Sequence, residues 1–191
     1  MKLRLIKEND IKDVLDVYKP FIKNTPITFE CTVPSMKKFR KRVEHVTAKH
    51  PWLVAEENDR IVGFAYASVF KERMAYSWDV ESSIYVIDDA GMQGIGTALY
   101  SAMEDILKLQ GFYNIYAILT TGVKRSLHFH ELMGYKKMYT LDCCGWKFDQ
   151  WYGITCMCKT IGDIHQPPKE IIPIKELEKK SIDKILKKYS V

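Results

Sequence analysis

Apolar residues recur along this chain at two spacings, one typical of helices and one typical of strands. Where they return every three or four positions, they mark the buried side of an amphipathic helix. The helices predicted in this way cover residues 9–22, 35–46, 95–111, 126–134 and 174–189. Where apolar and polar residues alternate, or a short apolar run has high strand propensity, a strand is expected. The predicted strands cover residues 3–6, 52–56, 61–70, 76–86, 113–119, 137–146 and 151–160.

The order of these elements indicates the fold class. Two helices follow the first strand, three strands come next, and the two following helices alternate with the remaining strands. This order predicts an α/β (α+β) sandwich around one mixed central sheet of about seven strands, flanked by helices. It excludes a doubly wound fold, in which strand and helix alternate throughout.

The chain changes character after residue 162, so we expect a domain over residues 1–162 and an extension over residues 163–191. Prolines at 167, 168 and 173 predict an extended linker before a Lys-rich amphipathic C-terminal helix. This helix either packs its apolar stripe on the domain or a sister subunit, or binds a membrane surface or a partner. Its acidic residues and its lack of Trp and Phe favour packing.

Composition narrows the class of protein. With 47% hydrophobic and 28% charged residues, the chain is unlike a disordered protein. Its longest mostly apolar stretch, residues 61–70, is too short to span a bilayer, and early charges interrupt any signal sequence. We therefore expect a soluble, cytoplasmic protein without membrane partners.

Cysteine usage and net charge narrow the compartment and the partners to expect. An odd number of cysteines, five, in a chain that needs no disulfide favours a reducing compartment. The pairs 143–144 and 156/158 lack CxxC spacing, so we expect buried strand thiols and no metal. The net charge of +5 is mild and does not indicate a nucleic-acid partner, although it suits an anionic small ligand.

A glycine-rich loop separates a predicted strand from a predicted helix. Its sequence is Gly91-Met92-Gln93-Gly94-Ile95-Gly96. Glycines allow close backbone approach, and the helix N-terminus adds partial positive charge, so a phosphate or pyrophosphate is the expected ligand. The spacing is neither that of a P-loop nor that of a Rossmann fingerprint. The alternative is a turn needed only for chain reversal.

A series of segments around this loop stands in a characteristic order and spacing. They are residues 28–30, 51–56, 63–67, 73–78, 80–86, 93–100, 110–112, 127–135 and 145–147. Together they resemble the GNAT acetyltransferases, and within these the phosphinothricin or methionine sulfoximine N-acetyltransferases, over about residues 2–160. Two positions depart from the family: Gly91 replaces the usual Arg or Gln, and Val123 replaces a common Asn.

The resemblance implies that acetyl-CoA is the cosubstrate. Its pyrophosphate would lie on the backbone amides of the glycine loop, and its pantetheine would pair with a strand that splays from its neighbour at 113–119. Ser126 is expected to contact the cofactor as well. The expected cofactor-binding residues are Ile84, Tyr85, Val86, Gly91, Met92, Gln93, Gly94, Ile95, Gly96, Thr97 and Ser126.

Acetylation of an amine requires the neutral amine, so a carboxylate near the thioester must take its proton. Glu81 matches the family's proposed general base; the alternative is a strand Glu that faces solvent. A backbone N–H near Tyr85 or Val86 is the economical donor to the oxyanion. His130 could protonate the CoA thiolate or hydrogen-bond the substrate, the alternative being a packed helix histidine.

The same resemblance places a substrate carboxylate on Arg73, whose alternative role is a surface salt bridge. Phe29, Glu30, Tyr76 and Trp78 would wall a small pocket. We therefore expect an N-acetyltransferase for a small amino-acid-like substrate.

The resemblance also implies a homodimer, and the aromatic-rich last hairpin agrees with that. Two alternatives remain open. One is a GNAT enzyme for a peptide, Lys or polyamine amine, and the other is a catalytically silent CoA-binding or interaction module.

Overall fold

A computed structural model describes residues 1–87 and 94–190. One seven-stranded mixed sheet has the strand order β1-β2-β3-β4-β5-β7-β6. Its strands are β1 (Lys2–Leu5), β2 (Trp52–Glu57), β3 (Arg60–Val69), β4 (Asp79–Val86), β5 (Asn114–Thr120), β6 (Lys136–Lys147) and β7 (Gln150–Thr160). The α-helices are α1 (Ile11–Asn24), α2 (Met36–Thr47), α3 (Ile95–Gln110), α4 (Lys124–Leu132) and α5 (Lys179–Tyr189).

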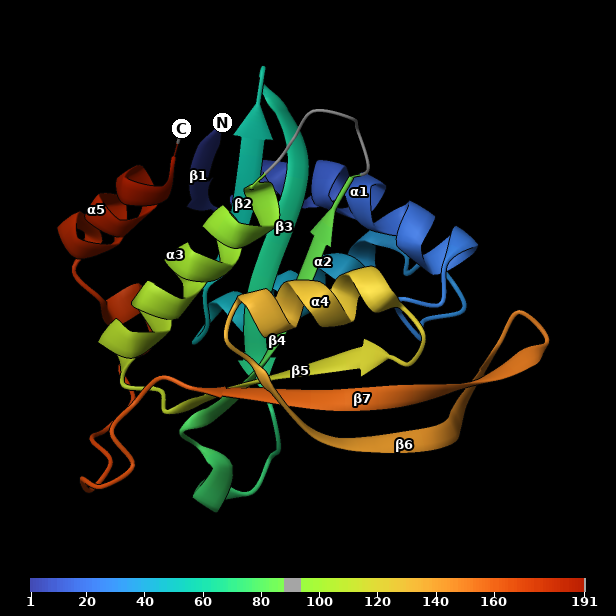
Figure 1. The fold of residues 1–191 in the computed structure, drawn as a ribbon. Helices are drawn as coiled ribbons and strands as arrows, with labels where there is room; N and C mark the ends of the chain where they lie inside the picture. Colours follow the sequence, from blue (N-terminus) through green and yellow to red (C-terminus); the bar gives the residue numbers. More distant parts are fainter. Residues whose placement is uncertain (88–93, 191) are drawn as a thin grey trace.

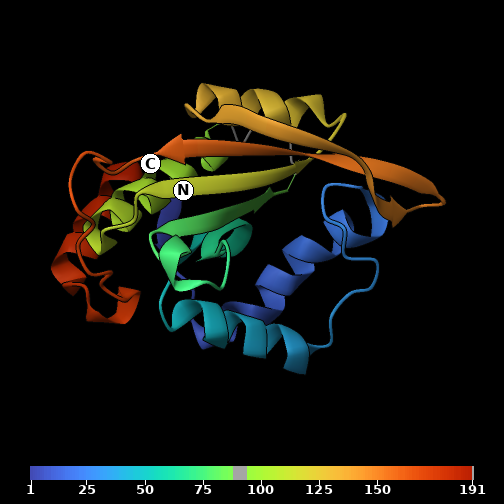
Figure 2. The same cartoon turned by 90° about the horizontal axis from the view of Figure 1, so that it is seen from below.

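The helices lie in two layers. Helices α3, α4 and α5 cover one face of the sheet, and α1 and α2 cover part of the other (Figures 1 and 2). Each layer has its own apolar core, because side chains of successive strand residues point to opposite faces. The predicted mixed-sheet sandwich is confirmed in element order. One boundary differs: Met74–Tyr76 forms a 3-10 turn, so β4 begins at Asp79 rather than at residue 76.

The C-terminal helix packs within the chain. Ile182 and Leu186 of α5 are buried against the core under α3. The Tyr189 hydroxyl donates to Asp105 of α3 at 2.7 Å, and the Leu3 amide of β1 donates to the Ser190 hydroxyl at 2.9 Å. The apolar stripe of α5 that the sequence showed therefore packs on α3 and on the edge strand β1. Among the helices of the described residues, none is long and apolar enough to cross a membrane.

The cysteines do not all follow the expectation of buried strand thiols. Cys156 is buried on β7, but Cys143 and Cys144 are exposed. The β6–β7 pairing shifts register between Leu141 and Gly145, and Cys143 takes a left-handed φ of 50° there. This irregularity breaks the alternation on which the expectation rested. All five thiols are free.

Candidate active site

The parallel strands β4 and β5 pair over only three residues and then part. Their last pair is Glu81 with Tyr116, beyond which β4 stays paired with β3 and β5 with β7. Figure 1 shows the two strands diverging beneath α4. Among the described residues, the backbone groups on their facing edges therefore have no strand partner, and an extended amide-containing ligand could satisfy them. The splay expected at Ile84–Val86 is present.

A pocket opens where the strands part. Its walls come from β4, β5, the residues after β5, α3, α4 and the connection between α1 and α2. They are Ile27, Ser82, Ser83, Ile84, Tyr85, Tyr100, Ile118, Leu119, Thr120, Val123, Ser126 and His130. Since neighbouring strand residues face opposite sides, this lining reaches both faces of the sheet. A ligand could thus approach from each side and meet another in the gap.

Glu81 stands at the closed end of this gap. It shares a face with Ser83, the next pocket-lining residue on that side of β4. Among the described residues, no hydrogen bond or ion pair reaches its half-buried carboxylate. Burial raises the pKa of this carboxyl because little water remains to solvate the charge. A carboxylate with a raised pKa and no partner has the properties of a general base.

His130 is buried in a hydrogen-bond network on the other side of the gap. Its Nδ1 lies 2.8 Å from the Ser126 carbonyl, which can only accept, so Nδ1 carries the proton. Its Nε2 then accepts from the Tyr100 hydroxyl at 3.0 Å. Burial lowers the pKa of His130 and favours the neutral ring. Both ring nitrogens are thus engaged.

Tyr100 and Ser82 extend this network to the point where the strands part. The Ser82 hydroxyl lies 3.2 Å from that of Tyr100 and donates to the Tyr116 carbonyl at 3.1 Å. Sequence reasoning missed both residues as part of the site. Ser82 and Tyr100 each place a hydroxyl on the buried face of their element, where a core needs no polar group, and this was the signal by which the sequence could have indicated them.

The described end of the glycine loop fits an anion site. Gly94 precedes α3 with a φ of +92°, and a Cβ there would meet no atom of the described residues within 4 Å, its chain neighbours aside. The first N–H groups of α3 have no partner within the helix. The Ile95 side chain is buried in the core, so only its backbone faces a ligand, and Thr97 is exposed. The expected residues Gly91, Met92 and Gln93 lie outside the described residues.

Phe29 and Glu30, two of the expected substrate residues, lie in the connection between α1 and α2. The Phe29 ring packs on Gly145 of β6, where a Cβ would lie only 2.2 Å from it. The Glu30 carboxylate forms an ion pair with Arg42 of α2 at 2.6 Å. Glu30 therefore offers a neutralised pair rather than a free negative charge, a feature that the sequence did not show.

The connection between β3 and β4 carries the other expected substrate residues. Phe70 stacks on Tyr116 with ring centroids 3.9 Å apart, and Tyr76 meets Phe70 edge-on. Arg73 is exposed, and its guanidinium has no ion-pair partner among residues 1–87 and 94–190. The Trp78 indole donates to the Lys169 carbonyl at 2.6 Å, so this side chain lies with the C-terminal linker and not with the pocket-lining residues.

Comparison with known proteins gives a consistent result. The GNAT acetyltransferase domain family matches residues 3–155. Phosphinothricin N-acetyltransferase of Streptomyces viridochromogenes is 27% identical over 177 residues, 93% of this chain and 96% of that protein. The L-methionine sulfoximine/L-methionine sulfone acetyltransferase of Pseudomonas paraeruginosa is 24% identical over 161 residues, 83% of this chain and 94% of the relative. The acetyl-CoA complex of a Sinorhizobium meliloti phosphinothricin acetyltransferase superposes with a TM-score of 0.85 at 28% identity, covering 90% and 95% of the two chains.

Proposed function

The chain belongs to the GNAT acetyltransferase family and is an acyltransferase, and we propose that it moves the acetyl group of acetyl-CoA to the α-amino group of a small, amino-acid-like substrate. The observation that carries this proposal is the Glu81 carboxylate at the end of the gap between β4 and β5, which has no hydrogen-bond or ion-pair partner among the described residues. Relatives named for phosphinothricin and methionine sulfoximine support the substrate class. The free thiols support a reducing, cytoplasmic location.

Acetyl-CoA fits the residues around the gap. The unpaired edge at Ile84, Tyr85 and Val86 would hold the amide-containing pantetheine, and the α3 N-terminus with Gly94 would hold the pyrophosphate. Ser126, which lines the pocket, would contact the same ligand. Acetyl-CoA supplies an activated thioester; the protein supplies the positions of the reacting groups.

Glu81 takes the proton of the attacking amine, directly or through one water. A backbone N–H near Tyr85 or Val86 donates to the carbonyl oxygen as it becomes negative. His130 acts on the departing sulfur through Tyr100. The Tyr100 hydroxyl, which lines the pocket and is held by His130 Nε2, would turn to the departing thiolate and stabilise it with a hydrogen bond, and the amine proton taken by Glu81 would reach the sulfur through solvent.

The phosphate site can be tested at Gly94. Acetyl-CoA should raise the Tm of the parent protein, because it binds the folded state only. Gly94→Asp should abolish this increase, since it places a negative charge where the pyrophosphate would lie. Gly94→Ala keeps the strain of a side chain at positive φ without the charge, and should retain part of the increase. An equal Tm increase in the parent and both variants would show that the pyrophosphate does not bind at this loop.

A thiol-release assay with a panel of amines tests the function itself. We expect acetyl-CoA turnover with methionine sulfoximine and related free amino acids, and much less with polyamines, peptides or amidated analogues. Preference for a polyamine or peptide would show that the proposed substrate class is wrong, while the assignment as an acetyltransferase would stand. Absence of turnover with every amine, together with retained acetyl-CoA binding, would favour the silent CoA-binding module.

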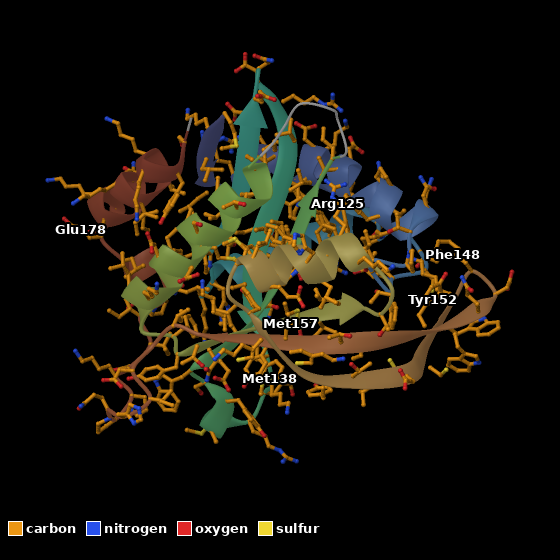
Figure 3. The ribbon with its side chains drawn as sticks, in the orientation of Figure 1. Arg125, Met138, Phe148, Tyr152, Met157 and Glu178 are labelled. Atoms are coloured by element: carbon orange, nitrogen blue, oxygen red, sulfur yellow. The ribbon has the colours of Figure 1, made fainter. Side chains whose placement is uncertain are left out.

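The last hairpin supports a homodimer with the active sites near the interface. Trp146, Phe148 and Trp151 of the β6–β7 hairpin are each about half exposed, at 54%, 46% and 58%. Figure 3 shows Phe148 and Tyr152 on the part of the hairpin that projects beyond α1.

Light scattering should give a dimer mass, and Trp151→Glu should reduce it to that of a monomer. Met74→Glu, at an 86% exposed site away from the hairpin, is the control. A parent mass that stays monomeric at all concentrations would contradict the dimer.

A further inference from the structure

Lys147, the last residue of β6, is a buried lysine whose ammonium is hydrogen-bonded to backbone carbonyls. Only 4% of its surface is exposed. Its ammonium donates to the Thr25 carbonyl at 2.8 Å and to the Thr28 carbonyl at 2.7 Å. In the described part of the chain, no carboxylate forms an ion pair with it. Burial lowers the pKa of this amine, because the charge loses its water. The ammonium also lies 4.9 Å from the centroid of the Phe148 ring, so two carbonyls and an aromatic ring hold its charge, and Glu30 adds a longer-range attraction.

The two carbonyls flank a pocket-lining side chain. Thr25 and Thr28 lie on either side of Ile27, whose side chain lines the gap between β4 and β5. The segment 25–30 receives two further hydrogen bonds at this point. The Thr120 hydroxyl of β5 donates to the Pro26 carbonyl at 2.6 Å, and the Tyr18 and Thr28 hydroxyls are 2.8 Å apart. The segment is thus held against the pocket wall from several elements.

A second contact from β6 holds the same segment. Gly145 stands two residues before Lys147, so both face the same side of the strand. The Phe29 ring occupies the space that a side chain at Gly145 would need. Segment 25–30 also carries Glu30, so β6 positions both residues expected to face the substrate side chain.

From these contacts we propose that Lys147 is a positioning residue for the acyl acceptor: it fastens segment 25–30 over the pocket and so sets the affinity for the amine without touching it. This inference rests on the proposed function for its kinetic consequence. A methionine would fill the same volume but leave two buried carbonyls without a donor. Lysine supplies both donors from one flexible side chain, which explains a charge where packing alone would use an apolar residue.

The test is Lys147→Met, measured by kinetics and by hydrogen exchange. The KM for the amine should rise on the order of tenfold, as expected when a charge-assisted contact is lost. The KM for acetyl-CoA should stay within about twofold, because β4, β5 and α3 are untouched. Amide exchange should accelerate in segment 25–30 and not in β4. Lys147→Arg, which keeps two donors, should restore most of the amine affinity.

Two further variants separate this role from general destabilisation. Lys159→Met removes a lysine of the neighbouring strand that pairs with Glu104 at 2.5 Å, and should leave both KM values unchanged. Gly145→Ala displaces Phe29 but keeps the lysine, and should raise the amine KM as well. Unchanged exchange of segment 25–30 in Lys147→Met would overturn the proposal, as would equal changes in both KM values. If the parent acetylates no amine, the proposed function fails, while hydrogen exchange still decides whether Lys147 holds the segment.

Discussion

Glu81→Gln should lower the rate of acetyl transfer by at least tenfold, and by up to the 10²–10⁴-fold typical of general-base catalysis. Glutamine keeps the shape of the side chain and removes the proton acceptor. Acetyl-CoA binding should persist, because the facing edges of β4 and β5 do not involve the carboxylate. The measurement is steady-state turnover, together with the Tm increase caused by acetyl-CoA.

The pH profile sharpens this test. Burial raises the pKa of Glu81, so the parent enzyme should lose activity, as pH falls, at a higher pH than an ordinary carboxyl would dictate. Glu81→Gln should lack this acid limb. A raised pKa also means that the folded state binds the proton more tightly than the unfolded state, so the ionised carboxylate is destabilising above that pKa. The variant should therefore be no less stable than the parent at neutral pH.

Asp79→Asn provides a matched control, two residues earlier on the same strand and face. Its carboxylate accepts from the Asn114 amide at 2.9 Å, a bond that the substituted amide oxygen can still accept. This variant should turn over normally. Normal turnover of Glu81→Gln across pH 6–9 would instead show that Glu81 is structural and that another group accepts the proton.

Arg73→Lys should raise the KM for an amino-acid substrate roughly 10- to 150-fold, the loss expected when charge-assisted hydrogen bonds disappear. A guanidinium binds a carboxylate through two parallel hydrogen bonds, which a lysine cannot copy. Arg73 is exposed and free of ion pairs among the described residues, so it is available for a ligand. The KM for acetyl-CoA should be nearly unchanged.

Amidated analogues give an independent measurement of the same contact. An analogue with its carboxylate amidated should be a poor substrate for the parent enzyme and should lose little more with Arg73→Lys. Arg40→Lys is the control, since Arg40 of α2 forms an ion pair with Glu8 at the surface. Equal acetylation of amidated and free-acid substrates would exclude a carboxylate contact and would favour a polyamine or peptide amine.

Local sequence determined most of the architecture. The spacing of apolar residues depends only on neighbours a few positions apart, so it indicated each helix and strand and their order. The positive φ of Gly94 follows from a glycine standing where a strand must turn into a helix. Residues 80–86, through their resemblance to a known family, also indicated where β4 would part from β5, and Glu81 stands at that point.

The partners of the functional side chains required the tertiary structure. Glu30 meets Arg42, Trp78 meets Lys169, and His130 meets Tyr100, in each case across a separation that no local pattern encodes. These pairings decide whether a charge is free, neutralised or shared, and thus which group can act on a ligand.

The same division holds for Lys147 and for the C-terminal helix. The sequence alone shows a lysine near a turn and an amphipathic stripe, both of which are ordinarily solvated or partnered elsewhere. Only the folded chain brings residues 25–30 beneath the end of β6 and places α5 on α3. Periodicity is set by short-range backbone geometry, whereas burial and charge pairing depend on which distant segments the folded chain brings together.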